Sequence, residues 1–312
     1  VVAFTPIGAA VVAATSYTLT LLGINPASMT AVITQAYGLR KVLTTYSGYA
    51  IKVRRSSDNT EQDIGFSGAN LDTAALLSFV GAGNGFITKW YDQSGNGRDM
   101  AQATTAAQPQ IVSAGVVLAN NGRPAITFDG VDDLLSRSAA SVYAAGAATV
   151  CGVASGVSTA NTQECVFGEG GTSNNNARYF INKCANAKFG HNIVSDASGS
   201  DVLAQDLSDT ADAATFGTTC TQWTFVDSGT QITRYRGGVG LINNTIQAAY
   251  TRSGKTLTLN RQAIGALIRL STTTFASITL SELIIVESAA NTTDRQFIEA
   301  NQKAYFGTPT GL

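Results

Sequence analysis

Short apolar or alternating runs recur along this chain from Ile111 onward, separated by clusters of Gly, Asn, Asp and Ser. Such runs between turn-forming residues are typical of strands, and their repetition at short intervals is typical of a sandwich or barrel. We therefore predict an all-β domain. The segments that we expect to be strands in this part of the chain are 125–128, 148–154, 178–182, 222–226, 231–235, 263–270 and 279–287.

Turn and capping residues place the other elements. The sequence Asp227-Ser228-Gly229 predicts a hairpin over residues 223–235, because Gly adopts the positive φ that a bulged hairpin turn needs. Asn291 and Gly307 are typical residues for the two ends of a helix, so we predict a helix over 292–305. Apolar spacing predicts further helices over 30–46 and 71–80, and strands over 50–54 and 86–91.

Composition excludes several classes of protein. The 312 residues carry 20 basic and 21 acidic side chains, so the basic excess expected of a nucleic-acid-binding protein is missing. Hydrophobic residues make up 44%, which is too many for a disordered chain. Charged residues make up 13%, against ~25% in ordinary soluble domains, so uncharged polar residues and Gly must form the surface. Such a surface suits β proteins that work outside a cell or pack side by side in an assembly.

The first charged residue is Arg40, so a long leading segment is uncharged. We expect residues 1–29 to form a strand-like arm and residues 30–312 to form one domain. Burying charges is costly, so an uncharged arm suits burial against a neighbouring subunit. No run approaches the ~20 apolar residues of a membrane helix, and the scattered Thr and Ser residues do not fit a signal peptide. We therefore expect no membrane insertion.

The four cysteines lie in apolar, strand-like segments, at positions Cys151, Cys165, Cys184 and Cys220. Their spacing does not fit a zinc site, and His191 is the only histidine. Two disulfides are compatible with the count, but buried free thiols are favoured. A Ser-His-Asp triad would have to use His191, which lies near no nucleophile elbow, so a structural or surface histidine is favoured.

Three motifs each join the end of a strand to a turn-forming cluster: VRRSSDN at residues 53–59, WYDQSGNG at 90–97 and FDGVDD at 128–133. Asp and Asn side chains close such turns by accepting hydrogen bonds from nearby backbone N–H groups, so an architectural role suffices. Arg54 or Arg55 is expected to brace the fold by pairing with Asp58 or Asp92, because Arg binds carboxylates bidentately.

These motifs resemble a known family. The run from AYGLRKVL at residue 36 through YSGYAIKVRRSSDN to WYDQSGNGRDMAQA resembles the N-terminal part of the catalytic domain of glycoside hydrolase family 54, the α-L-arabinofuranosidase B family. A similar module occurs in bacteriophage and prophage virion proteins. FDGVDD, the 223–238 hairpin and residues 281–307 resemble concanavalin A-like, laminin-G-type jelly rolls. The resemblance covers about residues 36–306 and implies a concanavalin A-like jelly-roll β-sandwich with a few short peripheral helices.

The resemblance also indicates where catalytic carboxylates would lie. Retaining glycosidases hold two carboxyl groups ~5–5.5 Å apart, and inverting enzymes hold them farther apart. The family's nucleophile is a Glu on a strand that follows a pair of adjacent cysteines. The matching segments here have Glu164 beside a lone Cys165 and then residues 178–182, RYFIN, without a carboxylate.

The family's acid/base Asp precedes the strand that is 279–286 here, near residues 270–272, and no acid lies between Asn260 and Thr279. Both catalytic positions are therefore expected to be empty. An active hydrolase would need relocated acids, for which Glu169 and Asp196 are the fallback candidates.

Binding without hydrolysis needs only an aromatic platform and a few fixed polar groups. The candidates for such a glycan site are Trp90, Tyr91, Asp92 and Asn96, with Tyr46 and Tyr49 as further aromatic residues. The alternative is that Trp90 packs in the core while the turn merely closes, and this alternative is favoured.

No cofactor is expected, although jelly rolls often bind calcium through carboxylate and amide oxygens. The candidate ligands are Asp129, Asp132 and Asp133. Carboxylates that stabilise a turn are the commoner case.

We therefore predict a non-enzymatic bacteriophage virion protein, structural, decorating or adhesive, that presents a glycan-binding type of jelly roll on the virion surface outside the cell. Its expected partners are copies of itself, other virion proteins and a cell-surface glycan, without nucleic acid. The alternatives are an active arabinofuranosidase-like hydrolase and a secreted lectin.

Overall fold

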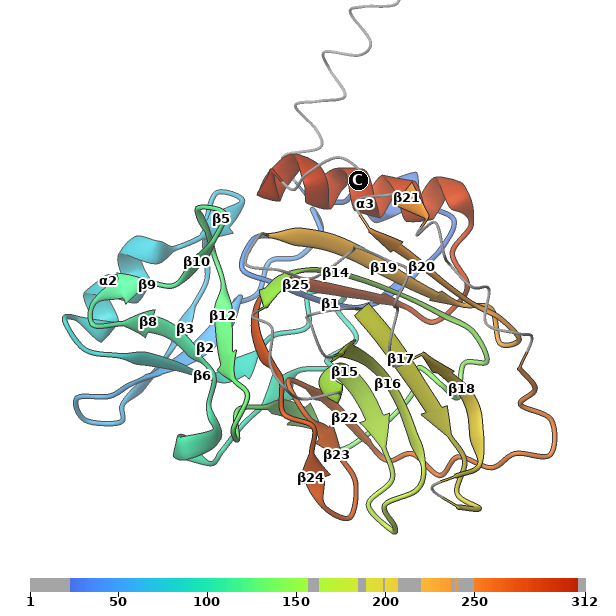
Figure 1. Cartoon of the computed structure of the whole chain (residues 1–312). Coiled ribbons are helices and arrows are strands. Elements are labelled where there is room, and N and C mark those ends of the chain that lie inside the picture. Colours follow the sequence, from blue (N-terminus) through green and yellow to red (C-terminus); the bar gives the residue numbers. More distant parts are fainter. Residues whose placement is uncertain are drawn as a thin grey trace, which may run out of the picture.

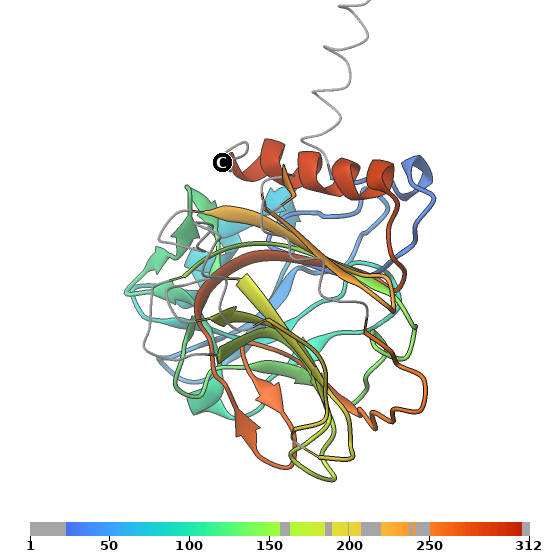
Figure 2. The same ribbon diagram turned by 45° about the vertical axis from the view of Figure 1, so that its right-hand side comes forward.

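Antiparallel strands in two layers build the molecule, an all-β sandwich with helix α3 across one outer face (Figures 1 and 2). The computed structural model describes residues 23–156, 163–184, 189–198, 200–206, 220–236, 239–240 and 250–307. Most of the predicted arm, residues 1–22, lies outside these ranges.

The first layer is organised around the long strand β25 (Ser277–Val286). β25 pairs on one side with β14 (Ala148–Gly156) and on the other with β1 (Ile33–Gly38) and β12 (Ile126–Asp129). β14 pairs with β19 (Thr221–Asp227), and the layer continues through β20 (Ile232–Arg236) to β21 (Val239–Gly240). The β19–β20 hairpin turns as predicted, with Gly229 at a φ of 90°.

The second layer has the order β18 (Val202–Asp206), β17 (Phe189–Val194), β16 (Arg178–Cys184), β15 (Gln163–Gly170), β22 (Arg261–Ile264) and β13 (Leu135–Arg137). It continues through β7 (Met100–Ala101) to β6 (Gly85–Trp90), β2 (Ile51–Arg55) and β3 (Glu61–Ile64). β8 (Gln110–Ser113) pairs with both β6 and β12, so it links the two layers.

Short elements complete the described chain. Besides β7 and β21, the two-residue strands are β4 (Phe66–Ser67), β5 (Asn70–Leu71), β9 (Val116–Val117), β10 (Ala119–Asn120), β11 (Arg123–Pro124), β23 (Leu267–Ile268) and β24 (Thr272–Thr273). The helices are η1 (Pro26–Ser28), α2 (Thr73–Val80), η2 (Thr105–Ala107) and α3 (Thr292–Phe306). No helix in the described ranges has the length and apolar character needed to cross a membrane.

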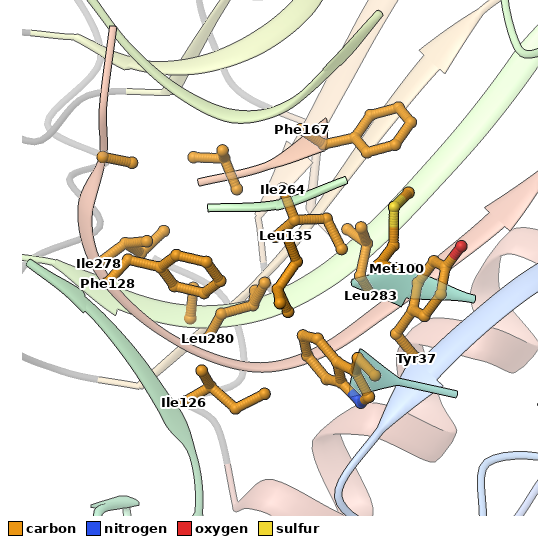
Figure 3. Close-up of a cluster of buried hydrophobic side chains, with 14 of the residues drawn as sticks. Tyr37, Met100, Ile126, Phe128, Leu135, Phe167, Ile264, Ile278, Leu280 and Leu283 are labelled. Carbon is orange, nitrogen blue, oxygen red and sulfur yellow. The ribbon is translucent and has the colours of Figure 1, made fainter. Parts of the chain in front are cut away.

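The core lies between the layers, where side chains from β1, β7, β12, β13, β15, β22 and β25 meet (Figure 3). β25 directs Ile278 and Leu280 into this core, and then Leu283 and Ile285. The change from even to odd positions follows from a bulge opposite Val153 and Ala154, where β25 has one extra residue. The bulge keeps both halves of the strand facing the core and turns Glu282 toward α3.

Helix α3 covers the outer face of β14 and β19. Asn291 caps its first turn by accepting from the Asp294 N–H at 2.9 Å, and Gly307 ends it at a φ of 62° in the left-handed region. Arg40 lies under the helix, 1% exposed. Its Nε donates to Glu282 at 2.6 Å, and its Nη2 donates to Asn301 at 2.6 Å.

The predictions of the 71–80 and 292–305 helices and of the hairpin are confirmed, whereas the helix predicted over 30–46 is wrong. Residues 33–38 form strand β1 instead. This strand is buried on both faces, with Tyr37 in the main core and Ile33 and Ala36 in a second cluster under α3. Burial on both faces removes the polar alternation of a strand and leaves an apolar spacing that resembles a helix.

The Arg40–Glu282 pair generates a stability prediction. Glu282→Ala should lower the free energy of unfolding by about 3–5 kcal/mol, because it leaves the buried Arg40 guanidinium without its carboxylate. Asp58→Ala is the control, because it breaks the solvent-exposed Arg55–Asp58 pair, and it should have a much smaller effect. Urea denaturation measures both, and equal losses would contradict the prediction.

Candidate functional site

The WYDQSGNG motif is an internal brace at the end of β6. Asp92 is 3% exposed and accepts from the Ala36 N–H at 2.9 Å, the Ser94 N–H at 2.9 Å and the Arg98 N–H at 3.1 Å. The next residue, Gln93, accepts from the Val42 N–H at 2.7 Å and donates to the carbonyls of residues 38 and 40. The motif therefore ties β1 and the segment after it to β6.

Two of the four candidate glycan-binding residues, Trp90 and Asp92, are consequently not available to a ligand, and for Trp90 this is the alternative favoured from the sequence. Trp90 is 0% exposed and packs against Tyr37 with ring centroids 5.9 Å apart, so its ring is not available to a ligand. The Asp92 carboxylate is occupied by backbone donors. Asn96 is exposed and donates to the Thr34 carbonyl at 2.9 Å, so it also holds the turn.

Tyr91 lies in a different environment, in an aromatic group that we call the tyrosine surface: Tyr46, Tyr49, Phe66 and Tyr91. Tyr49 is 52% exposed, and its ring centroid lies 6.2 Å from that of Tyr91. Tyr46 and Phe66 form a second, edge-to-face pair with centroids 6.3 Å apart. The Tyr46 hydroxyl donates to the Tyr49 carbonyl at 2.9 Å and so joins the two pairs.

Polar groups border this surface and fix its rings. The Tyr91 hydroxyl donates to Asp63 at 2.6 Å, and the Lys89 ammonium lies 5.1 Å from the Tyr91 ring centroid. Burial raises the pKa of Tyr46 to about 12, with Asp99 and Asp92 adding to the shift, so its hydroxyl is protonated at neutral pH. Held aromatic faces next to a carboxylate and an ammonium are the features that bind the apolar face and the hydroxyls of a sugar. Phe66 was not predicted, because it lies in a separate segment.

Of the Arg–Asp pairs expected at residues 53–59, the Arg55–Asp58 pair is present, as a partly exposed contact within the turn. Arg55 binds Asp58 through Nε at 2.8 Å and Nη2 at 2.7 Å. Arg54 instead binds the Gln108 side chain at 2.7 Å and Asn59 at 2.8 Å.

The fallback carboxylate Glu169 lies on β15 and is 0% exposed. It accepts from the N–H groups of Ser141 at 2.7 Å, Val142 at 2.9 Å and Tyr143 at 2.9 Å, and from the Gln262 amide at 3.1 Å. Burial raises its pKa, and the backbone donors oppose that shift. Glu169 therefore anchors the 141–143 loop from inside and does not face an open groove.

The second fallback carboxylate, Asp196, is bound by a segment that we call the strap, residues 250–260. Asp196 accepts from the Thr258 N–H at 2.8 Å and the Thr258 hydroxyl at 2.7 Å. At its start, the strap is held in the first layer, where Arg252 pairs with Asp227 at 2.6 Å. In the middle, Lys255 pairs with Asp201 at 2.6 Å.

The strap covers one end of the sandwich because Leu257 and Leu259 pack against the main core. It also approaches β15 closely, since a Cβ on Gly171 would lie 2.2 Å from the Thr258 carbonyl oxygen. Glu169 and Asp196 are thus bound by different segments, and the strap occupies the space beside Asp196. Near the other expected catalytic position, Leu270 is exposed between β23 and β24.

The candidate cation ligands are the three carboxylates of FDGVDD. One oxygen from each of Asp129, Asp132 and Asp133 lies within 4.8 Å of the others. Asp129 accepts from the Val131 N–H at 2.8 Å, and Asp133 accepts from the Asp129 N–H at 3.0 Å, so two of the three also stabilise the turn. An all-oxygen set suits a hard cation such as Ca²⁺.

The cysteines and the histidine are structural. Cys151, Cys165 and Cys220 are buried free thiols, as favoured from the sequence. The side chain of Cys184 lies outside the described part of the chain. His191 is 1% exposed on β17, and burial lowers its pKa to about 3, so it is neutral. Neither ring nitrogen has a hydrogen-bond partner among the described residues, whereas a triad histidine would bind both an acid and a nucleophile.

Comparison with known proteins agrees with the fold. The sequence profile of a family described as "Alpha-L-arabinofuranosidase B, catalytic" matches residues 24–201. A search among curated protein sequences finds no match.

Two solved arabinofuranosidase structures superpose on most of the chain. One is a Glu-to-Gln mutant of a glycoside hydrolase family 54 α-L-arabinofuranosidase soaked with 4-nitrophenyl α-L-arabinofuranoside, at 15% identity and a TM-score of 0.64, covering 91% of this chain and 64% of that one. The other is an arabinofuranosidase complexed with arabinofuranosyl-α-1,2-xylobiose, at 14% identity and a TM-score of 0.65, covering 90% and 65%. The chain thus spans slightly less than two thirds of the length of these proteins, and at this identity the likeness concerns the fold.

The cation cluster generates a pH prediction. Burial raises the pKa of Asp133 to about 7, with the Asp129 charge adding to the shift. Because the folded pKa lies above the unfolded value, the contribution of Asp133 to stability is complete below about pH 4 and is lost as the pH rises toward 7. Asp133→Asn should therefore melt at a higher temperature than the parent protein at pH 8 in chelator, and at a similar temperature at pH 4.

Calcium should reverse the order of the two melting temperatures at pH 8, so that the parent protein melts above Asp133→Asn, because only the parent protein keeps all three carboxylates. Glu61→Gln, an exposed charge removal on β3, is the matched control and should respond like the parent. Melting curves from pH 4 to pH 8 measure these differences, and an identical calcium response in Asp133→Asn would refute the cation site.

Proposed function

Since the chain belongs to the α-L-arabinofuranosidase B catalytic family, we propose that it recognises glycans bearing α-L-arabinofuranosyl groups and binds them without hydrolysis. The observation that carries the proposal is the contrast between the fallback carboxylates and the rings of the tyrosine surface. Glu169 is sealed and fully hydrogen-bonded, and Asp196 is held by the strap, whereas the tyrosine surface presents the exposed ring of Tyr49 beside the half-buried ring of Tyr91. The names of the superposed arabinofuranosidases support the choice of sugar.

The chemistry of hydrolysis explains why the buried acids matter. A glycosidase needs two carboxyl groups on opposite sides of the scissile bond, one of which gives or takes a proton. Glu169 accepts three hydrogen bonds that fix the 141–143 loop and a fourth from Gln262, so using it as a nucleophile or acid would break that anchor. Binding places no such demand, since stacked rings and a few polar groups suffice.

The binding prediction concerns the exposed ring of Tyr49 and the half-buried ring of Tyr91. Tyr49→Ala and Tyr91→Ala should each weaken binding to arabinan about fivefold or more, because each removes a stacking face worth about 1 kcal/mol. Tyr91→Phe is the matched control, since it keeps the ring and loses only the hydrogen bond to Asp63. Titration calorimetry with debranched and branched arabinan measures the affinities. Unchanged affinity in both alanine variants would exclude the tyrosine surface as the site.

Hydrolysis is the second candidate function, favoured by the family membership. The proposal predicts no release of nitrophenol from 4-nitrophenyl α-L-arabinofuranoside above the rate without protein. Release that disappears in Glu169→Gln or in Asp196→Asn would establish the hydrolase with relocated acids instead.

Assembly on a virion is a separate prediction, motivated by the charge-poor composition. It requires symmetric copies of the chain, whereas a secreted lectin needs none. Electron microscopy of the purified protein distinguishes the two, since only the virion role predicts closed, symmetric oligomers.

A further inference from the structure

A pocket adjoining the tyrosine surface, where its lining residue Leu71 pairs with Phe66, lies in the lobe formed by α2, β5, β9 and β10 (Figure 1). Its volume is about 510 Å³, within the range of sites for small ligands. Leu71, Leu77 and Pro124 provide apolar lining, and Val116 at the pocket is 66% exposed. The pocket is therefore accessible from solvent and large enough for one or two sugar residues.

The end of α3 fixes the one charged side chain in this lining, Arg123. Its Nε donates to the Tyr305 carbonyl at 3.0 Å, and its guanidinium lies 4.3 Å from the centroid of the Tyr305 ring. The Tyr305 hydroxyl donates to the Asn70 oxygen at 2.7 Å. Because that bond uses the amide oxygen, it leaves the Asn70 nitrogen as a donor.

The pocket lining carries the positive charge of Arg123 without a carboxylate to balance it among the described residues. No carboxylate lines the pocket among the described residues, and no described carboxylate forms an ion pair with Arg123. The polar lining side chains Arg123, Asn70 and Thr73 are rich in donors. A ligand that matches this lining brings acceptors, and a carboxylate matches a held guanidinium best.

We propose that this pocket, named here the Arg123 pocket, binds a uronic acid, with the sugar carboxylate on the Arg123 guanidinium. The sugar ring packs on the apolar lining, and its hydroxyls face Asn70 and Thr73. The inference goes beyond the proposed function, because it assigns a second site with a different ligand. A free uronic acid and a uronic acid within a glycan share this chemistry.

Titration calorimetry with galacturonate, trigalacturonate and neutral galactose tests the inference. Galacturonate should bind at least about tenfold more tightly than galactose, since a hydrogen-bonded charge pair is worth about 1.4 kcal/mol or more. Equal affinity for monomer and trimer identifies the free acid as the ligand, and tighter binding of the trimer identifies the glycan. Galacturonate binding no tighter than galactose would overturn the inference.

Three variants locate the site. Arg123→Gln should weaken galacturonate binding about tenfold, and Arg123→Lys should restore part of it. Val116→Glu places a negative charge at the pocket without touching α3, so it tests the site even if the Arg123 variants fold poorly. Arabinan binding through the tyrosine surface should be unchanged in all three, which separates failure here from failure of the proposed function. Unchanged galacturonate affinity in both Arg123→Gln and Val116→Glu would refute the site.

Discussion

Buried carboxylates hold this molecule together by accepting hydrogen bonds from segments that are distant in the sequence. Asp92 joins the turn after β6 to β1, Glu169 joins β15 to the 141–143 loop, and Glu282 joins β25 to Arg40 under α3. Asp227 joins β19 to the strap through Arg252. A buried carboxylate without such donors would be costly, so each of these acids commits its neighbours to one arrangement. The chain has 21 acidic residues, and these four each join segments that are distant in the sequence.

The use of buried carboxylates as structural hydrogen-bond acceptors limits the chemistry that they can perform. A carboxylate that already accepts several hydrogen bonds is held in one position and has no free oxygen to offer a substrate. Glu169 is the clearest case, since its donors include three consecutive backbone N–H groups. Family membership and a sealed acid are therefore compatible, because the fold persists through its core and its braces while a function depends on particular exposed side chains.

The sequence predicted the elements whose signals are local. The cap residues Asn291 and Gly307 predicted α3, and Asp227-Ser228-Gly229 predicted the β19–β20 hairpin. The prediction failed at β1, because pairing with β25 and burial on both faces determine that strand. Trp90 and Tyr91 are neighbours in sequence, yet Trp90, the last residue of β6, is in the core and Tyr91, the residue after it, is half-buried at the surface.

The sites that escaped prediction combine segments from several parts of the chain. Phe66 completes the tyrosine surface, but no local pattern links it to Tyr46. The sequence around Arg123 is typical of a surface residue, and only the structure shows that the end of α3 contacts its guanidinium. Leu257 and Leu259 alternate with Thr in a polar segment, which gives little sign that they pack on the core and close one end of the sandwich.

A crystal structure of the protein soaked with an arabinofuranosyl oligosaccharide tests most directly whether this sandwich holds a sugar or cuts it. We expect the oligosaccharide intact against Tyr49 and Tyr91, with the strap in place and Glu169 still bound to the 141–143 loop. A sugar ring lodged between Glu169 and Asp196, with the strap displaced, would contradict the account.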